Sequence, residues 1–365
     1  MLDVLKDFEF KKGVHLKNKL VMAPMTTWSS NDDYTVADQE LNYYDKRSYG
    51  PGMIITGCAH IQPNGIGFTN EYSIDDDEFL PGLTQLATTV KKHGAKAIIQ
   101  INHAGNKALP QVEDLVSASN IAVSRNPEAP IPRALSEDEI NEVIKDFGKA
   151  TKRAIEAGFD GIELHGAHGF LLQNFMSTHF NHRTDQWGGT LENRMRFPLE
   201  VVKEVQRVIA QYASKEFILG YRFSPEEHYE DGLTLEDNYA LIDELINLDI
   251  DYVHASLVNA LESKSRDYHD SYLNLLTHHI DNRIKLLVAG QISTIDSAEN
   301  IWKSGAIPAI GHAFVTDPNW IQQTIQDNRY QVNLTINPND LSDLRLPDKL
   351  WHEIQSAPGW FDVKS

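Results

Sequence analysis

The chain has 365 residues, of which 41% are apolar and 23% charged, so it is long enough to bury a large core. Its 52 acidic residues outnumber 33 basic ones, and the formal charge of −19 disfavours nucleic acid and anionic membranes as partners. The single cysteine, Cys58, excludes an intramolecular disulfide framework and an iron–sulfur cluster held by this chain alone. No apolar run reaches the length of a membrane span, and the opening MLDVLKDFEFKK lacks a signal core, so a cytoplasmic protein is expected.

Short apolar runs alternate with longer amphipathic stretches along the chain. Each run has the length and composition of a parallel strand that is buried on both faces. The expected strands are residues 20–25, 53–60, 97–102, 161–165, 217–223, 252–256, 286–290 and 309–311.

Helices are expected between these strands. Ser136 and Glu139 form a capping box ahead of a helix that runs to about Ala157, and Gly158 suits its C-terminal end. Eight strands alternating with about eight helices predict an α/β fold closed into a (β/α)8 TIM barrel with eight parallel strands. A doubly wound open sheet is the rival, but no G-x-G-x-x-G follows the first strand, which disfavours a Rossmann domain.

No linker divides the chain. Residues 1–328 are therefore expected to form the barrel, and residues 329–365 a C-terminal extension of the same domain that packs on the barrel through its tryptophans. Segments 61–79 and 107–133 are long and polar or proline-containing, which is typical of loops that cover an active site.

Polar side chains gather where the expected strands end, which is where barrels of this kind carry their catalytic groups. His165 and His168 share a glycine-bearing turn after the fourth strand, and suit metal binding, acid–base work or hydrogen bonding to an oxyanion. Arg222 ends the fifth strand, where burial is costly unless the guanidinium meets an anion or a carbonyl. The alternative for Arg222 is a structural ion pair with Glu163 or Asp160.

Three further residues suggest a cofactor. The amide of Gln100, inside the third strand, needs a partner that both donates and accepts, such as a flavin pyrimidine edge or the backbone. Gly290 and Gly311 end the seventh and eighth strands, whose loops commonly bind phosphate through backbone N–H groups.

The most specific stretch is HGAHGFLLQNFMSTHFNHRTDQWGGTLENRMRF. It resembles the old yellow enzyme family of FMN oxidoreductases, which carries a similar H-x-x-H-G opening and then an R-x-D-x-W/Y-G-G-x-x-x-N-R block. The resemblance extends from about Asn18 to Pro318, and APMTTW and GYRFSP are similar to the family's first-strand and fifth-strand motifs. The block braces a loop and consists here of Arg183, Asp185, Trp187, Gly188, Gly189, Asn193 and Arg194.

The resemblance implies an enzyme that passes hydride from NADH or NADPH through FMN to the electron-poor C=C bond of a carbonyl-activated, enone-like substrate. His165 and His168 would bind the substrate's carbonyl oxygen, and Trp28 and Phe170 would form the substrate wall. Arg222 would stabilise the reduced flavin. The residues implied to contact the FMN ring are Pro24, Met25, Thr26, Ala59, Gln100 and Arg222, and those implied to hold its phosphate are Gly290, Gln291, Gly311 and His312.

Three positions depart from the family's pattern. Phe170 stands where the family often has a tyrosine that donates the proton, so another group or water supplies it, or the physiological reaction differs. His312 and Asn106 each stand where the family often has an arginine.

Two other functions stay open on the residues alone. One is a metal-dependent barrel isomerase or aldolase with His165, His168 and Glu163 as ligands. The other is a non-catalytic flavin-binding protein, for which Phe170 is the only indication. The preferred interpretation needs no metal and expects a homo-oligomer that acts on a small molecule.

Overall fold

The computed structural model of this chain describes residues 2–11, 13–123, 128–327 and 329–364. Its centre is a parallel sheet of strand order β3-β13-β12-β11-β10-β9-β6-β4-β5, which closes on itself because β3 also pairs with β4. The barrel strands are β3 (Val21–Met22), β4 (Met53–His60), β6 (Lys96–Asn102), β9 (Gly161–Gly166), β10 (Ile218–Phe223), β11 (Tyr252–Ser256), β12 (Lys285–Ala289) and β13 (Ile307–Ile310). The short β5 (Tyr72–Ser73) pairs only with the end of β4. The predicted (β/α)8 barrel is confirmed, and the open-sheet alternative is wrong because the sheet has no gap between β3 and β4.

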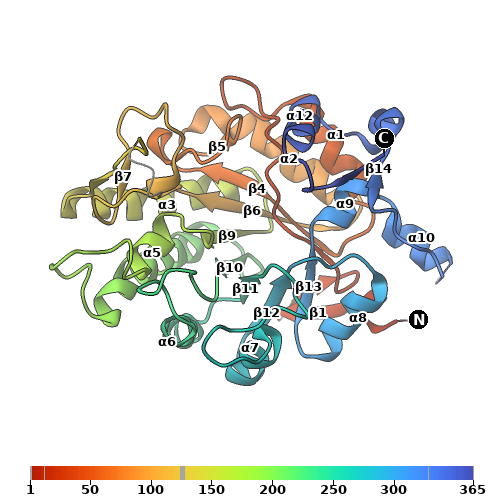
Figure 1. Cartoon of the computed structure of the whole chain (residues 1–365). Helices are drawn as coiled ribbons and strands as arrows, with labels where there is room; N and C mark the ends of the chain where they lie inside the picture. Colours follow the sequence, from red (N-terminus) through yellow and green to blue (C-terminus); the bar gives the residue numbers. More distant parts are fainter. Residues whose placement is uncertain (1, 12, 124–127, 328, 365) are drawn as a thin grey trace.

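The outer layer consists of helices that follow the strands in sequence and surround the barrel (Figure 1). They are α1 (Asp38–Arg47), α2 (Leu80–Lys91), α3 (Glu137–Glu156), α4 (Leu171–Met176), α5 (Leu191–Tyr212), α6 (Leu235–Asn247), α7 (Tyr272–Ile280), α8 (Ile295–Lys303), α9 (His312–Thr316) and α10 (Trp320–Gln326). None of the helices in the described part of the chain combines the length and apolar character needed to cross a bilayer.

The first strand is shorter than predicted. Residues 20–25 were expected to be extended in the sheet, whereas only Val21–Met22 form β3. Ala23 still donates its N–H to the carbonyl of Ile310 at 2.9 Å, but Pro24 has no N–H to continue the ladder. The chain therefore leaves the sheet at Pro24.

Side chains inside the barrel are apolar at one end and polar at the other. The hairpin of β1 (Phe8–Lys11) and β2 (Val14–Leu16) packs Phe10 against barrel side chains such as Ile98 and Ile218. Each strand alternates its side chains between the interior and the helical layer. Gln100 and Arg222, two residues and four residues beyond these isoleucines, consequently lie deeper toward the opposite end, where they line a cavity.

The C-terminal segment returns along α1, as Figure 1 shows. It contains β14 (Thr335–Ile336), α11 (Leu341–Leu344), α12 (Asp348–Ser356) and β15 (Asp362–Val363), and β14 pairs with β15. Arg345 binds Asp45 of α1 at 2.6 Å, and Trp351 and Trp360 pack against the main hydrophobic core. The predicted packing of this tail through its tryptophans is confirmed.

The block with the R-x-D-x-W/Y-G-G spacing braces the long loop after α4. Arg183 donates to the carbonyls of Ala118 and Leu135 at 3.1 and 2.7 Å and binds Asp185 at 2.6 Å. Arg194 reaches back to the carbonyl of Met176. This geometry fits a structural role.

The helix predicted after Ser136 is α3, and its capping box is present. The Ser136 hydroxyl accepts from the N–H of Glu139, whose carboxylate accepts from the N–H of Ser136 at 2.7 Å. Ser136→Ala is expected to lower the free energy of unfolding by about 1 kcal/mol, because one orphan N–H loses its acceptor. Urea unfolding of the variant measures this loss, with Ser136→Thr as the control that keeps the acceptor. An unchanged urea midpoint in Ser136→Ala would contradict the role of the cap.

Candidate functional site

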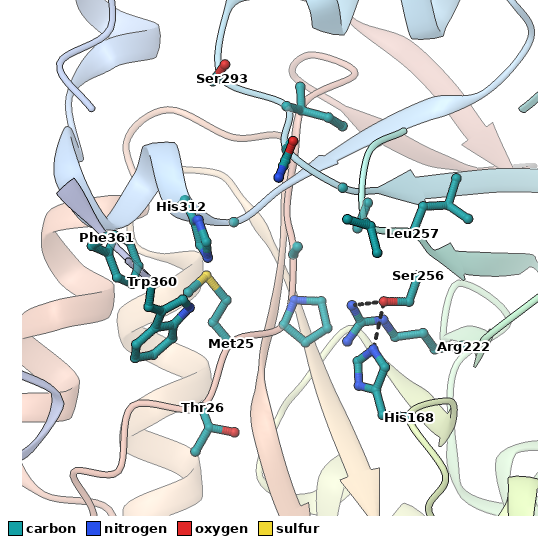
Figure 2. A pocket seen from close by; sticks show the side chains of 18 of the residues that line it. Met25, Thr26, His168, Arg222, Ser256, Leu257, Ser293, His312, Trp360 and Phe361 are labelled. Atoms are coloured by element: carbon teal, nitrogen blue, oxygen red, sulfur yellow. Dashed lines mark hydrogen bonds between the residues drawn. The ribbon is translucent and has the colours of Figure 1, made fainter. Parts of the chain in front are cut away.

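A cavity of about 670 Å³ opens at the C-terminal ends of the barrel strands, a size that suits a small-molecule or cofactor site. Figure 2 shows its side chains converging from opposite sides of the barrel. Its lining brings together most of the residues that the sequence singled out: Pro24, Met25, Thr26, Trp28, Gln100, His165, His168, Arg222, Gly290, Gln291, Gly311 and His312.

Ala59 and Phe170 lie just outside this lining. A bulge in β4 between Ile55 and Cys58 shifts the alternation by one residue, so Cys58 faces the cavity and Ala59 packs in the outer core. Phe170 is buried behind His165, with the two rings edge to face and their centroids 4.7 Å apart.

A buried polar network lies beneath the cavity. Gln100 donates from Nε2 to Glu163 Oε1 at 2.7 Å, and its Oε1 accepts from the Cys58 thiol at 3.1 Å. Glu163 Oε2 binds Nδ1 of His254 at 2.8 Å. Burial alone would raise the pKa of Glu163, but His254, the charge of Arg222 and the Gln100 amide hold that pKa below its usual value. Glu163 is therefore an anion under the cavity floor.

The guanidinium of Arg222 faces the cavity and is only partly satisfied by the protein. Its Nη2 donates to Ser256 Oγ at 3.0 Å, while the buried Nε has no partner among the described residues. The ion pair of Arg222 with Glu163 or Asp160 is not observed in the described structure. Glu163 binds His254, and Asp160, at the N-terminal end of β9, lies 3.6 Å from Lys96. Arg222 thus offers charge and a free N–H to an anion or a carbonyl.

The two histidines at the C-terminal end of β9 differ in their surroundings. His165 is 3% exposed, and its Nδ1 accepts from the N–H of Ala167 at 3.3 Å, which places the ring proton on Nε2. His168 opens onto the cavity, and its Nε2 lies 2.7 Å from Ser256 Oγ (Figure 2). Ser256 Oγ also accepts from Arg222. In the tautomer in which His168 Nε2 accepts the Ser256 proton, the ring carries its own N–H on Nδ1.

Both imidazoles are neutral donors near pH 7. Burial, then electrostatic repulsion from the neighbouring His168 ring and from Arg222, lower the pKa of His165 well below its usual value. Desolvation in the barrel mouth and the charge of Arg222 likewise lower the pKa of His168. Each ring presents one N–H, a pair suited to a shared oxygen acceptor.

A metal site is not formed by these residues. Glu163 is turned to Gln100 and His254, away from His165 and His168. Within the residues that the structure describes, no group of three histidine, cysteine or acidic side chains is arranged to hold a metal ion. The three ligands that a metal-dependent isomerase or aldolase would need here, His165, His168 and Glu163, are therefore not brought together.

The opposite end of the cavity has the features of a phosphate site. Gly290 has a φ of +148°, and a Cβ there would lie 2.7 Å from the carbonyl oxygen of Leu257. Gly311 precedes α9 (His312–Thr316), whose first N–H groups have no acceptor within the helix. A Cβ on Gly311 would lie 3.0 Å from Met25 Sδ, so glycine keeps this approach open. Burial lowers the pKa of His312, so its ring is neutral and an anion here depends on backbone N–H groups.

Aromatic side chains from distant segments wall the cavity. The Trp28 ring lies edge to face with Phe68 at 5.6 Å and with Trp360 at 5.5 Å, and Phe361 lies 4.4 Å from the His312 ring. Sequence reasoning missed Trp360 and Phe361 as site residues, although it expected the tail to pack on the barrel.

Phe68 belongs to the first of the two loops expected to cover the site. The second, 107–133, provides no lining residue in its described part, and its residues 124–127 lie outside the described residues. Ser256 was also missed; its signal was a polar residue at the end of an expected strand.

The arrangement fits FMN. A cation with an unsatisfied N–H and an amide lie at one end, where a flavin ring has oxygen and nitrogen acceptors along its pyrimidine edge. Backbone kept open by two glycines lies at the other end, where the cofactor's single phosphate would lie. Pro24, Met25 and Thr26 form the floor between the two ends.

Known proteins resemble this chain along nearly its whole length. Residues 3–331 match the NADH:flavin oxidoreductase / NADH oxidase family. The chain is 39% identical over 99% of its length to the probable NADH-dependent flavin oxidoreductase YqiG of Bacillus subtilis, and covers 98% of that protein. It is 36% identical to the NADH:acrylate oxidoreductase of Vibrio harveyi and to the NADH:fumarate oxidoreductase of Klebsiella pneumoniae. The match spans 96% and 95% of this chain but only 36% and 38% of those longer proteins.

Solved structures share the fold. The old yellow enzyme homologue from Zymomonas mobilis superposes with a TM-score of 0.78 at 22% identity, covering 95% of this chain and 99% of that one. Morphinone reductase gives a TM-score of 0.76 at 24% identity, with 91% of both chains covered. The family match, the relative of equal length and the cavity's two ends lead to one conclusion: the chain belongs to the NADH:flavin oxidoreductase / NADH oxidase family and is an FMN-dependent oxidoreductase of old yellow enzyme type.

Proposed function

We propose that this enzyme uses NADH or NADPH to reduce the C=C bond of an unsaturated carbonyl compound. The observation that carries the proposal is the pair of neutral imidazole N–H groups, on His165 and His168, beside the charge of Arg222. The names of the acrylate and fumarate oxidoreductases support it, since both compounds have a C=C bond next to a carbonyl-type group. This chain matches only about a third of those proteins, so the substrate class rests on the cavity.

Bound FMN supplies the redox chemistry, because a flavin accepts hydride from a nicotinamide and returns it to an electron-poor carbon. Gln100 and Arg222 would hold the ring's pyrimidine edge, and the backbone at Gly290, Gln291, Gly311 and His312 would hold the phosphate. Arg222 would favour the reduced cofactor, because a positive charge beside the pyrimidine edge stabilises the electron density that a flavin gains on reduction.

His165 and His168 would bind the carbonyl oxygen of the substrate. Two N–H donors on that oxygen draw electron density from the conjugated bond and make its far carbon a better hydride acceptor. Trp28 and Phe68, which both line the cavity, would limit the width of the substrate.

The reduction also needs a proton for the carbon next to the carbonyl. No tyrosine lines the cavity in the described part of the chain, and burial raises the pKa of the Cys58 thiol far above neutrality. We assign the proton to water that enters through the cavity mouth.

The direct test is spectroscopic. Anaerobic NADH should bleach the flavin absorbance of the purified protein, and an enone should restore it. Para-substituted phenols should bind the oxidised enzyme with a long-wavelength charge-transfer band, and His165→Ala and His168→Ala should each weaken that binding by roughly 1–3 kcal/mol. Bleaching by NADH should change less in these variants. A yellow protein that NADH does not bleach would instead be a non-catalytic flavin binder.

Arg222 is expected to set the affinity and the potential of the flavin. Arg222→Ala should weaken FMN binding by about 1.5–3 kcal/mol and lower the reduction potential, because a charge-assisted contact is lost. Arg222→Lys keeps the charge and serves as the control. A folded Arg222→Ala variant with an unchanged potential would remove this role.

Phe170 tests the proton source. Phe170→Tyr is expected to accelerate enone reduction, by at most about 10²-fold, because a hydroxyl would be introduced close to His165 but behind the cavity wall. Stopped-flow reoxidation of the reduced enzyme measures this rate. Phe170→Leu controls for changed packing and should give no acceleration. An unchanged rate in Phe170→Tyr would mean that proton delivery does not limit the reaction.

A further inference from the structure

Behind the cavity floor lies a carboxyl group that the proposed chemistry does not use. Glu40, on α1, is 0% exposed, and its Oε1 accepts a hydrogen bond of 2.5 Å from the hydroxyl of Thr27. Its other oxygen, Oε2, is buried and has no partner among the described residues. Thr27 lies between Thr26 and Trp28, both of which line the cavity.

The segment that Thr27 belongs to has left the barrel sheet. Pro24 ends the ladder, and Trp28 has a φ of +50°, a conformation that a bulky residue adopts only when its surroundings enforce it. The Thr27 carbonyl accepts from the Ser29 hydroxyl, which tightens the turn. Contacts from outside the sheet therefore decide where Thr26 and Trp28 lie.

Helix α1 supplies these contacts at two points. Glu40 binds Thr27 directly, and Tyr44, one turn further along the same face, accepts from the N–H of Gly57 at 2.9 Å. Gly57 in turn supports the segment, because a Cβ there would lie only 2.7 Å from the carbonyl oxygen of Met25. That Cβ would also lie 3.2 Å from the Cα of Thr26, so Gly57 packs against Thr26 itself. The hydrogen bond between Glu40 and Thr27 joins α1 to the residue that lies between Thr26 and Trp28.

Glu40 has no ion pair in the described structure. The ionisable groups around it are Tyr43 and Tyr44 of α1 and Tyr72 of β5 (Tyr72–Ser73), while Arg47 donates to backbone carbonyls, including that of Val315. Burial raises the pKa of Glu40 to about 7, although the Thr27 bond opposes the change. The carboxyl is therefore neutral in acid and becomes an unpaired anion behind the flavin floor above about pH 7.

We propose that Glu40 is a positioning residue for the flavin site, which fixes Thr26 and Trp28 through its hydrogen bond with Thr27. The proposal rests on the proposed placement of the flavin ring against Thr26. It also makes the site sensitive to pH: ionised Glu40 would oppose the negative charge that a flavin gains on reduction, whereas neutral Glu40 would not.

Hydrogen–deuterium exchange of the peptide spanning residues 23–30 tests the positioning. Glu40→Ala and Thr27→Val should each speed its exchange about two- to tenfold, the factor expected for one lost hydrogen bond. Glu40→Gln and Thr27→Ser keep an acceptor or a hydroxyl and should exchange like the wild type. If Glu40→Ala does not fold, Thr27→Val still decides, and wild-type exchange in the folded Thr27→Val variant would overturn the proposal.

The flavin's reduction potential, measured from pH 6 to 8.5 on the holoenzyme, tests whether ionised Glu40 opposes flavin reduction. The potentials of the wild type and Glu40→Gln should agree at pH 6, and above about pH 7 the wild-type potential should fall below that of the variant. A difference that does not change with pH would refute the coupling. If wild-type protein binds no FMN, the proposed function fails, while exchange measured on the flavin-free chain still decides the role of Glu40.

The pH dependence of the unfolding free energy provides an independent check on the ionisation of Glu40. The native chain holds the Glu40 proton up to about pH 7, whereas an exposed glutamate releases it near 4.5, so this residue's contribution to the unfolding free energy falls as pH rises between those values. Glu40→Gln should lack this fall. A variant that follows the wild-type profile throughout that range would show that Glu40 ionises normally in the folded chain.

Discussion

The pairing of β3 with β4 closes the parallel sheet, and the site depends on that closure. In a closed parallel barrel every strand ends at the same rim, so residues that lie far apart in sequence face one another across a few ångströms. Met25 after the first strand and Gly311 after the eighth are neighbours for this reason: a Cβ on Gly311 would lie 3.0 Å from Met25 Sδ. An open sheet would place these two residues at opposite edges.

Inside the closed barrel, the charges of Glu163 and Arg222 compensate each other although the two side chains form no ion pair in the described structure. Glu163 is bound by His254 and Gln100, while the guanidinium of Arg222 donates to Ser256 and keeps a buried N–H free. The anion below lowers the cost of burying the cation above, yet leaves the cation available at the cavity surface. The same charge, acting with desolvation, keeps His165 and His168 neutral, so they can donate hydrogen bonds without acting as acids. One buried ion therefore influences both the cofactor end and the substrate end of the site.

Segments outside the barrel complete the cavity. The loop with Phe68 and the tail with Trp360 meet at Trp28, and α1 holds the Trp28 segment from behind through Glu40. Loops and tails tolerate sequence change better than a barrel sheet does. Differences in substrate between this chain and its relatives are expected to arise in this wall more than in the layer of Gln100, Glu163 and Arg222.

The sequence by itself determined where the strands and helices lie and which polar residues follow the C-terminal ends of the strands. Apolar runs located the strands, Ser136 with Glu139 located the start of α3, and polar residues after the strands located His165, His168 and Arg222. These signals are local, since they depend on side-chain periodicity and on hydrogen bonds within a few residues. The tertiary structure alone decided which residues meet. The bulge in β4 turned Cys58 toward the cavity instead of Ala59, the tail brought Trp360 to Trp28, and Ser256 joined Arg222 to His168. None of these follows from periodicity, because each depends on packing between segments that are distant in the chain or on a one-residue shift in register.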